Sequence, residues 1–242
     1  YDRTVPQTRW PCNSCKGYGC KKCNDTGQLY PDSVQSLVAE PFIGATSCKE
    51  DLFHGMGRED IDAAMLGSGR PFVIELRMPK FRNLNLSMIE NQINKKNESR
   101  IKVTNLKFVE RSRVPELKNT VCDKTYRVDV SVIGEDSIES LKKGAQRLTG
   151  TVIEQRTPMR VSHRRADLVR PRLINSIDVT SFEGNMAELI IRAQHGTYIR
   201  ELVSGDEGRT NPSFSSLVDA TCKVEVLDVL NLHLDAKEEK ND

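Results

Sequence analysis

The stretch Lys124-Thr125-Tyr126-Arg127-Val128-Asp129-Val130-Ser131-Val132 carries the clearest pattern of secondary structure in the sequence. Apolar and polar residues alternate along it, which predicts a β-strand with one face in the core and one polar face. Tyr126 begins the apolar row. A tyrosine in this place usually belongs to the core, although at a strand end its hydroxyl group could also face a cleft. The stretch therefore predicts the anchor of a sheet and offers one candidate site residue.

Elements on either side of this strand indicate the fold class. Further strands are expected at 72–77, 101–109 and 188–193, where apolar and β-branched residues concentrate. Helices are expected at 33–40, ended by Pro41, at 87–93 after a capping box that begins at Ser87, at about 137–144, and at 197–203. The charged tail 235–242 is expected to fray. Strands and helices alternate irregularly, which favours a mixed α+β fold over regular βαβ winding.

The composition is that of a globular protein. The 242 residues suggest one or two domains with a sizeable core, and 29% charged against 37% hydrophobic residues indicates a soluble chain without a membrane span. No signal peptide is evident, and the chain begins at Tyr1 without a methionine, so we expect a piece of a longer protein with a further domain upstream. Because the net charge is only +2, binding partners have to be inferred from local charge.

Two C-x-x-C pairs mark the beginning of the chain. Cys12, Cys15, Cys20 and Cys23 are separated by a short glycine-containing stretch that lets the backbone reverse, and four thiolates complete a tetrahedral zinc shell. An iron–sulfur cluster, redox chemistry and disulfides are the alternatives. The other three cysteines are isolated in the sequence, which argues against a disulfide framework and for a reducing compartment, and we expect a cytoplasmic protein. A closed four-cysteine site predicts a structural metal, most simply zinc.

The strongest concentration of positive charge lies between Arg156 and Arg172. Six arginines and His163 share this range with Asp167 as the one acid, and Pro158 and Pro171 prevent one continuous helix. A solvated face would normally mix lysine with acids, whereas arginine without acids suits bidentate contact with phosphate. We therefore expect nucleic-acid binding here, through contacts that position a substrate without reading its sequence.

A glycine-rich loop runs from Gly55 to Pro71 and contains both acids and arginines. It lacks the third glycine of a dinucleotide fold and the Gly-Lys-Ser/Thr of a phosphate loop, so no nucleotide cofactor is expected. An acid beside an arginine on such a loop is more often a solvated turn than a catalytic carboxylate. The loop is therefore a candidate site only if other motifs in the chain support a function for it.

Three motifs resemble those of pseudouridine synthases. Gly57-Arg58-Glu59-Asp60 resembles their catalytic-aspartate motif, Lys124-Thr125-Tyr126 their Lys-x-Tyr motif, and Gly196-Thr197-Tyr198-Ile199-Arg200 their Gly-Thr-Tyr-Ile-Arg motif. More narrowly, the stretches 67–72, 156–165 and 205–212 are similar to the tenth family, the archaeal and eukaryotic tRNA pseudouridine synthases. The resemblance covers nearly the whole chain, and the cysteine segment is similar to the archaeal branch.

This resemblance implies roles for individual residues. Asp60 would be the catalytic carboxylate, Tyr126 would stack on the uracil, and Arg200 would pair with Asp60 and keep it ionised. Arg58 and Tyr198 would contribute to loop geometry and pocket packing. The residues expected to contact RNA are Lys124, Arg160, His163, Arg164, Arg165 and Arg209.

Two positions in the same loop qualify the assignment. Asp62 is the rival of Asp60 for the catalytic role, although the Gly-Arg-x-Asp register favours Asp60. Ala64 stands where the family pattern has arginine, which affects a local RNA or loop contact but not the chemistry. Attack of the aspartate on the sugar, attack on the base and removal of a sugar proton remain alternatives.

The resemblance also implies an architecture and a reaction. The fold would be a pseudouridine synthase catalytic fold with a mixed, mainly antiparallel sheet, flanking helices and a central RNA cleft. Residues 1–30 would form the four-cysteine segment and a linker from an upstream THUMP-containing RNA-binding domain, and 31–242 the catalytic domain. The reaction would convert uridine to pseudouridine in the T-arm of tRNA, at position 55 and also 54, without a cofactor.

Two other classes of function remain open. A non-catalytic tRNA-binding protein or chaperone would use the same arginines without Asp60, and a zinc-ribbon interaction module would depend on the cysteines alone. The sequence leaves the oligomeric state open.

Overall fold

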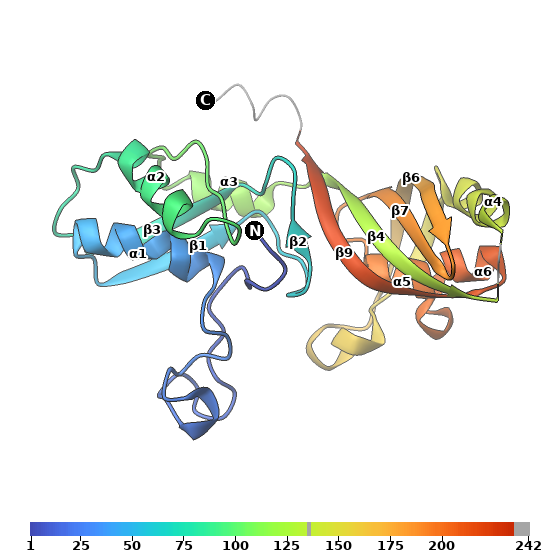
Figure 1. Cartoon of the computed structure of the whole chain (residues 1–242), viewed down its shortest axis with the longest axis horizontal. Coiled ribbons are helices and arrows are strands. Elements are labelled where there is room, and N and C mark those ends of the chain that lie inside the picture. The colour runs from blue at the N-terminus through green and yellow to red at the C-terminus, as the bar shows by residue number, and fades with distance from the viewer. Residues whose placement is uncertain (135–136, 235–242) are drawn as a thin grey trace. The chain divides into compact units, whose positions relative to one another are not determined.

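The computed structural model describes residues 1–134 and 137–234, which divide into two compact units (Figure 1). Unit 1 comprises Tyr1–Met65 and Arg70–Thr120, and unit 2 comprises Leu66–Gly69 and the chain from Val121 onward. This division by contacts differs from the expected division between residues 30 and 31, which stays a prediction. The expected fraying of 235–242 lies outside the described residues.

Unit 1 combines three α-helices with a two-stranded antiparallel sheet. Strand β1 (Glu50–Gly55) pairs with β3 (Phe72–Arg77), and α1 (Val34–Thr46) and α3 (Arg113–Asn119) both contact this pair. Helix α2 (Leu86–Lys96) packs on α1, and the rings of Phe53 and Phe72 stack with their centroids 5.2 Å apart. The short 3-10 helix η1 (Lys21–Cys23) and strand β2 (Ala64–Met65) complete the unit. The apolar faces of α1 and α2 build its core.

The structure corrects two helix boundaries in unit 1. Helix α1 does not end at Pro41 but continues to Thr46, because Val38 and Phe42 lie one turn apart on its buried face. Their burial offsets the roughly 3 kcal/mol that an internal proline costs a helix. Helix α2 begins at Leu86 with Asn85 as its N-cap, and the side chain of Asn85 accepts a hydrogen bond from the backbone N–H of Met88.

The strand expected at 101–109 is wrong. Ile101 and Val103 are buried as the pattern suggested, but the segment joins no sheet. Instead, the side-chain amide of Asn94 donates to the carbonyl of Val103 and accepts from its N–H, both at 2.8 Å. A side chain therefore satisfies the backbone groups that a neighbouring strand would otherwise pair.

Unit 2 is built on a twisted antiparallel sheet (Figure 1). Its strands follow the order β9 (Thr221–His233), β4 (Asp123–Ile133), β7 (Met186–Ala193), β6 (Val169–Glu183), β5 (Val152–Arg156) and β8 (Thr210–Asn211). The alternation in β4 is confirmed, since its apolar row is buried from Tyr126 to Val132. Strand 188–193 is also confirmed, as part of β7.

Three α-helices accompany the sheet in the described part of unit 2. Helix α4 (Ile138–Leu148) packs on β6, α5 (Ile199–Ser204) contacts β9, and α6 (Phe214–Val218) packs on α4. Helix α4 continues past its expected end at Gly144 to Leu148. A side chain at position 144 would collide with Val218 of α6. The glycine therefore permits close helix packing and does not mark a helix end. The 3-10 helices η2 (Met159–Arg164) and η3 (Asp206–Gly208) lie in connections.

The short segment Leu66–Gly69 belongs to unit 2 although unit 1 precedes and follows it. The N–H of Leu66 donates to the carbonyl of Val229 at 2.8 Å, and Ser68 Oγ donates to Asn231 Oδ1 at 3.1 Å. Gly67 has a positive φ of 61°, and a Cβ atom there would collide with the carbonyl of Leu230. Only glycine therefore fits this position against β9.

The α+β fold class is confirmed. Across residues 1–134 and 137–234, no helix combines the length and hydropathy needed to cross a bilayer.

Candidate functional site

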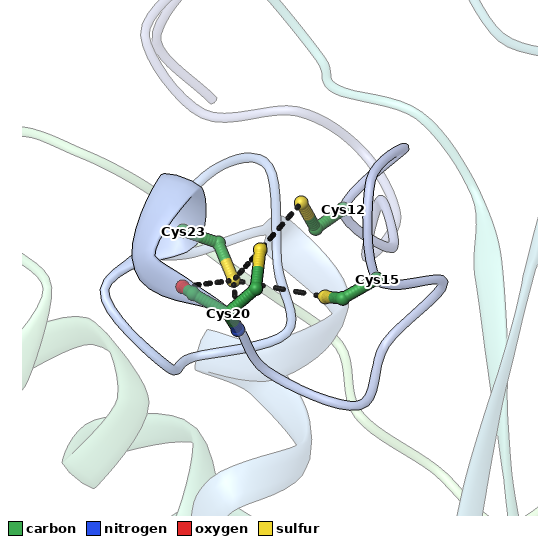
Figure 2. A group of neighbouring side chains, drawn as sticks. All are labelled: Cys12, Cys15, Cys20 and Cys23. Atoms are coloured by element: carbon green, nitrogen blue, oxygen red, sulfur yellow. Dashed lines mark hydrogen bonds between the residues drawn. The ribbon is translucent and has the colours of Figure 1, made fainter.

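The four cysteines of the N-terminal segment come together in unit 1 (Figure 2). The sulfur atoms of Cys12, Cys15, Cys20 and Cys23 all lie within 4.8 Å of one another. Three separations are 4.0 Å between Cys12 and Cys20, 3.8 Å between Cys15 and Cys23, and 3.7 Å between Cys20 and Cys23. Four sulfur ligands about 2.3 Å from a tetrahedral zinc ion lie about 3.8 Å from one another. The cluster therefore has the dimensions of a tetrahedral metal site.

Backbone hydrogen bonds favour the thiolate form in this cluster. The N–H of Gly19 donates to Cys15 Sγ at 3.2 Å and the N–H of Cys20 to Cys23 Sγ at 3.3 Å. Backbone N–H groups of Cys15 and Ser14 lower the pKa of Cys12 to about 6, against the opposing effect of desolvation, whereas desolvation and hydrogen bonds with Cys23 and Cys15 raise the pKa of Cys20 to about 11. Since thiolates and not thiols bind metal ions, this donor set fits a metal.

The loop that carries Asp60 is held by Arg70, a residue that the sequence reasoning did not single out. Arg70 donates from Nη1 to the carbonyl of Met56 at 2.6 Å and from Nη2 to Glu59 Oε1 at 2.8 Å, and its side chain is 4% exposed. Gln7 adds a hydrogen bond to the carbonyl of Gly57 at 3.1 Å. The backbone that leads into Asp60 is therefore fixed within unit 1.

Other predicted residues divide between the units. Arg58 and the rival acid Asp62 are exposed on the loop of unit 1. In unit 2, Tyr126 and Lys124 are buried on β4, and Arg200 Nη1 donates to the carbonyl of Val224 at 3.0 Å. The predicted ion pair of Asp60 with Arg200, the RNA contact of Lys124 and the central RNA cleft stay predictions.

The motif residue Tyr198 is held through its backbone. The side chain of Gln155, which is 2% exposed on β5, donates to the Tyr198 carbonyl at 3.0 Å and accepts from its N–H at 2.7 Å. This arrangement fixes the start of α5 against the sheet of unit 2. The glutamine directly precedes the predicted basic region and carried no sequence signal of its own.

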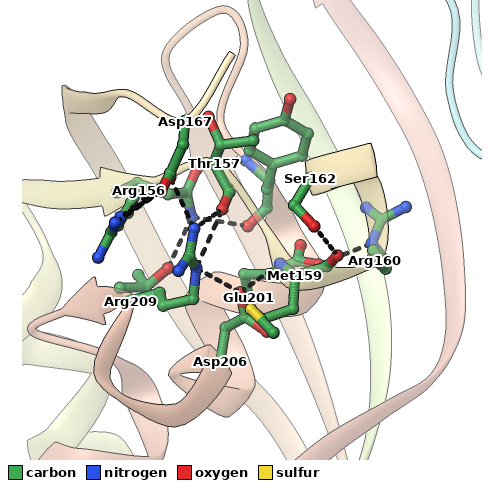
Figure 3. A network of polar contacts seen from close by, with 12 residues as sticks. Arg156, Thr157, Met159, Arg160, Ser162, Asp167, Glu201, Asp206 and Arg209 are labelled. Carbon is green, nitrogen blue, oxygen red and sulfur yellow. Dashed lines mark hydrogen bonds and ion pairs between the residues drawn. The ribbon is translucent and has the colours of Figure 1, made fainter. Parts of the chain in front are cut away.

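Residues 157–168, here called the arginine loop, leave β5 and return at β6 (Figure 3). Thr157 closes the neck of the loop, since its hydroxyl donates to the Ala166 carbonyl at 2.7 Å and accepts from the Leu168 N–H at 3.1 Å. Asp206 of η3 accepts from the N–H of Met159 at 3.0 Å. The loop is therefore fixed at its neck and at the start of η2.

Two of the predicted basic residues lie outside the arginine loop and support it through Asp167. Asp167 accepts from Arg156 Nη2 at 2.6 Å and from Arg209 Nη2 at 2.7 Å, and Arg209 also donates to the Thr157 carbonyl (Figure 3). Hydrogen bonds from Arg156, followed by the charge of Arg209, lower the pKa of Asp167. Arg209, predicted to contact RNA, thus has a structural role in this loop.

The side chain of Arg160 forms a hydrogen bond with a residue of α5. Its Nε donates to Glu201 Oε1 at 2.7 Å, and its guanidinium carbon lies 5.9 Å from the centre of the Tyr198 ring. The Glu201 side chain is 5% exposed. Sequence reasoning missed Glu201, although it follows the Gly-Thr-Tyr-Ile-Arg motif directly.

The remaining predicted RNA contacts face solvent. His163, Arg164 and Arg165 are exposed on and just after η2, and none of the three has an ion pair within the described parts of the chain. Arg156 and Arg209 thus support the loop, whereas the exposed His163, Arg164 and Arg165 can contact a phosphate backbone. This arrangement can bind a polyanion on a rigid loop next to Tyr198.

Comparison with known proteins identifies the family. The family model described as Pus10, C-terminal matches residues 1–233. Proteins named tRNA pseudouridine synthase Pus10 from Methanothrix thermoacetophila and Methanocaldococcus jannaschii are 46% and 47% identical to the chain. The alignments cover 95% and 96% of the chain and 51% and 50% of those proteins. The chain thus spans about half the length of the curated relatives it matches.

A solved structure shares the fold. A chain in the crystal structure of a Cbf5-Nop10-Gar1 complex superimposes with a TM-score of 0.51 at 14% identity, over 81% of this chain and 44% of that one. At this identity the likeness shows the fold alone. The family match extends from the cysteine cluster through the loop of Asp60 to strand β9, and the chain therefore belongs to the Pus10 C-terminal family.

Proposed function

We propose that the chain is the catalytic part of a tRNA pseudouridine synthase, which isomerises uridine to pseudouridine. The observation that carries this proposal is the family match across residues 1–233, which includes Asp60, Tyr126 and Arg200 in a single alignment. The names of the relatives at 46% and 47% identity support the reaction and the substrate class. We further propose the T-arm as the target, at position 55 and also at 54.

Asp60 is proposed as the catalytic carboxylate. The reaction detaches the uracil from its ribose carbon, turns it and rejoins it through C5, so it needs a carboxylate against an extruded nucleotide. The anchoring of the preceding backbone by Arg70 supports this role, because a fixed loop limits the positions that the carboxylate can take. Tyr126 is proposed to stack on the uracil and Arg200 to keep Asp60 ionised, with Arg58 and Tyr198 contributing to the pocket.

The cysteine cluster is proposed to hold a structural zinc ion. Its four thiolates would complete the coordination shell and leave no open position for a substrate, so the metal would stabilise the N-terminal segment. The isomerisation itself is proposed to need no cofactor.

The substrate is proposed to bind through exposed cations, with His163, Arg164 and Arg165 on the arginine loop as the first contacts. Contacts by Lys124 and Arg160, an upstream RNA-binding domain and a cytoplasmic location are further parts of the proposal.

Pseudouridine formation on a T-arm tRNA transcript tests the function. The Asp60→Asn and Asp60→Ala variants are compared with the unaltered chain at equal RNA occupancy, and Asp62→Asn is the matched control from the same loop. Loss of product with both Asp60 variants, and its retention with Asp62→Asn, would establish Asp60 as the catalytic acid. Activity that survives in Asp60→Ala would overturn the assignment.

A non-catalytic RNA-binding role is the second candidate, and the exposed cations of the arginine loop favour it. If the unaltered chain binds the transcript without modifying it, the same assay on a protein of the relatives' full length decides. Product from the longer protein supports the synthase, whereas its absence supports the binder.

A further inference from the structure

The segment between β3 and α2 exposes apolar side chains among positive charges. Met78 is 66% exposed and Phe81 is 62% exposed, and Lys80 and Arg82 flank the phenylalanine. We propose that Phe81, Lys80 and Arg82 form a second RNA-binding site, on unit 1, in which an unpaired base stacks on Phe81. The choice of RNA as the ligand rests on the proposed function.

The backbone of this segment is fixed although its side chains are exposed. The N–H groups of Lys80 and Phe81 both donate to the carbonyl of Thr46, at 2.8 and 3.1 Å. Thr46 is 1% exposed at the end of α1, and its hydroxyl donates to the Phe42 carbonyl at 2.7 Å. The ring of Phe81 is thus presented on an anchored turn, which reduces the entropy lost when a ligand binds.

The charge of the segment is one-sided. No acid occurs from Leu76 to Ile89, a range that contains Arg77, Lys80 and Arg82. Arg77 is engaged by Glu50 and Glu75, each at 3.2 Å. Lys80 and Arg82 are exposed and form no ion pair with any residue that the structure describes. Two uncompensated cations therefore lie on either side of an exposed ring.

This combination matches single-stranded nucleic acid better than protein. Proteins that bind unpaired nucleotides stack bases on aromatic rings and contact the backbone phosphates through cations. Protein interfaces are also enriched in phenylalanine, methionine and arginine, but they are depleted in lysine and, at their core, in charged residues, so the two uncompensated cations favour a polyanion. A flipped or looped-out nucleotide would leave neighbouring unpaired bases, which are the ligands that such a ring can take.

Phe108 offers a matched control within the same unit. It is 68% exposed, but Glu110 lies two positions after it, and no carbonyl among residues 1–134 and 137–234 accepts from its backbone N–H as that of Thr46 does from Phe81. Replacing either phenylalanine by alanine removes the same exposed ring. Only the Phe81 variant should affect RNA binding.

The test measures the affinity of the full chain for a labelled single-stranded oligouridylate. Phe81→Ala should weaken binding about tenfold, within the range found when a stacking ring is removed, whereas Phe81→Tyr should retain affinity. Phe108→Ala should stay within about twofold of the unaltered chain, since it removes no stacking contact. The double variant Lys80→Ser, Arg82→Ser should reduce the slope of log affinity against log salt by about 1.4, for two lost phosphate contacts.

The affinity measurements test the RNA site independently of the proposed pseudouridine synthase activity. Equal affinities for Phe81→Ala and the unaltered chain, or an equal loss with Phe108→Ala, would overturn the site whatever the activity. A selective loss with Phe81→Ala would support the RNA site even if no pseudouridine is formed, in which case the synthase proposal alone fails.

Discussion

At the scale of single residues, the pair of Glu201 and Arg160 connects the arginine loop to the helix that follows the Gly-Thr-Tyr-Ile-Arg motif. The carboxylate is nearly buried, at 5% side-chain exposure, while the guanidinium is 38% exposed. Glu201 Oε2 has no hydrogen-bond partner within the described part of the chain. A hydrogen bond of 2.7 Å joins the pair, and the guanidinium group of Arg160 also lies near the ring of Tyr198.

Replacing Glu201 by alanine should lower the free energy of unfolding by about 1–3 kcal/mol, because the loop loses a charged hydrogen bond at a buried site. Urea unfolding followed by circular dichroism measures this change. Glu225→Ala is the control, since Glu225 pairs with the exposed Lys223, and such surface pairs contribute about 0–1 kcal/mol. An equal effect of both substitutions would contradict an anchoring role for Glu201.

Residue types were readable from the sequence, but residue roles were not. The basic region and the motif residues were predicted, yet Arg156 and Arg209 turned out to support Asp167, whereas Arg164 and Arg165 face solvent. Asp167 lies 42 positions from Arg209 in the chain, and only the fold brings them together. A local pattern cannot distinguish a paired arginine from an available one when the partner is that distant.

At the scale of elements, the arginine loop should be sensitive to acid. The pKa of Asp167 is lowered by hydrogen bonds from Arg156 and by Arg209, so its stabilising effect is present above the unfolded pKa of about 3.9. It is lost as the pH falls through the lower folded pKa. The melting temperature of the unaltered chain should therefore fall more steeply below about pH 4 than that of Asp167→Asn.

The comparison is made from pH 7 to pH 2.5 by thermal unfolding of both proteins. At neutral pH, Asp167→Asn should melt below the unaltered chain, and the two curves should converge in acid. Parallel curves would show that Asp167 adds no pH-dependent stability to the loop.

The successes and failures of element prediction have physical reasons. Strand β4 was predictable because its alternation reflects one buried and one polar face. Two predictions failed because tertiary contacts outweighed local propensity. The buried face of α1 lets the helix continue past Pro41, and the side-chain amide of Asn94 pairs with the backbone of Val103, so that residues 101–109 need no neighbouring strand. Local propensity therefore predicted the elements with a regular pattern and missed those completed by a distant side chain.

At the scale of the whole molecule, the cysteine cluster predicts a metal stoichiometry. Elemental analysis of the purified chain should find about one zinc ion per molecule, as four cysteines complete one tetrahedral site. Cys20→Ser should lose the metal, whereas Cys48→Ser should keep it, since Cys48 lies outside the cluster. Iron in place of zinc, or metal retained by Cys20→Ser, would contradict the zinc assignment.

The path of the chain through the two units has a consequence for how the protein forms. Leu66–Gly69 is synthesised well before the residues of β9 that bind it, since Ser68 and Asn231 lie 163 positions apart in the chain. During synthesis this short segment lacks its hydrogen-bond partners until β9 has emerged. Leu66–Gly69, which begins directly after Met65, can therefore take its final position only after β9 is complete. A translation product that ends before β9 would therefore leave Leu66–Gly69 without its partners Val229 and Asn231.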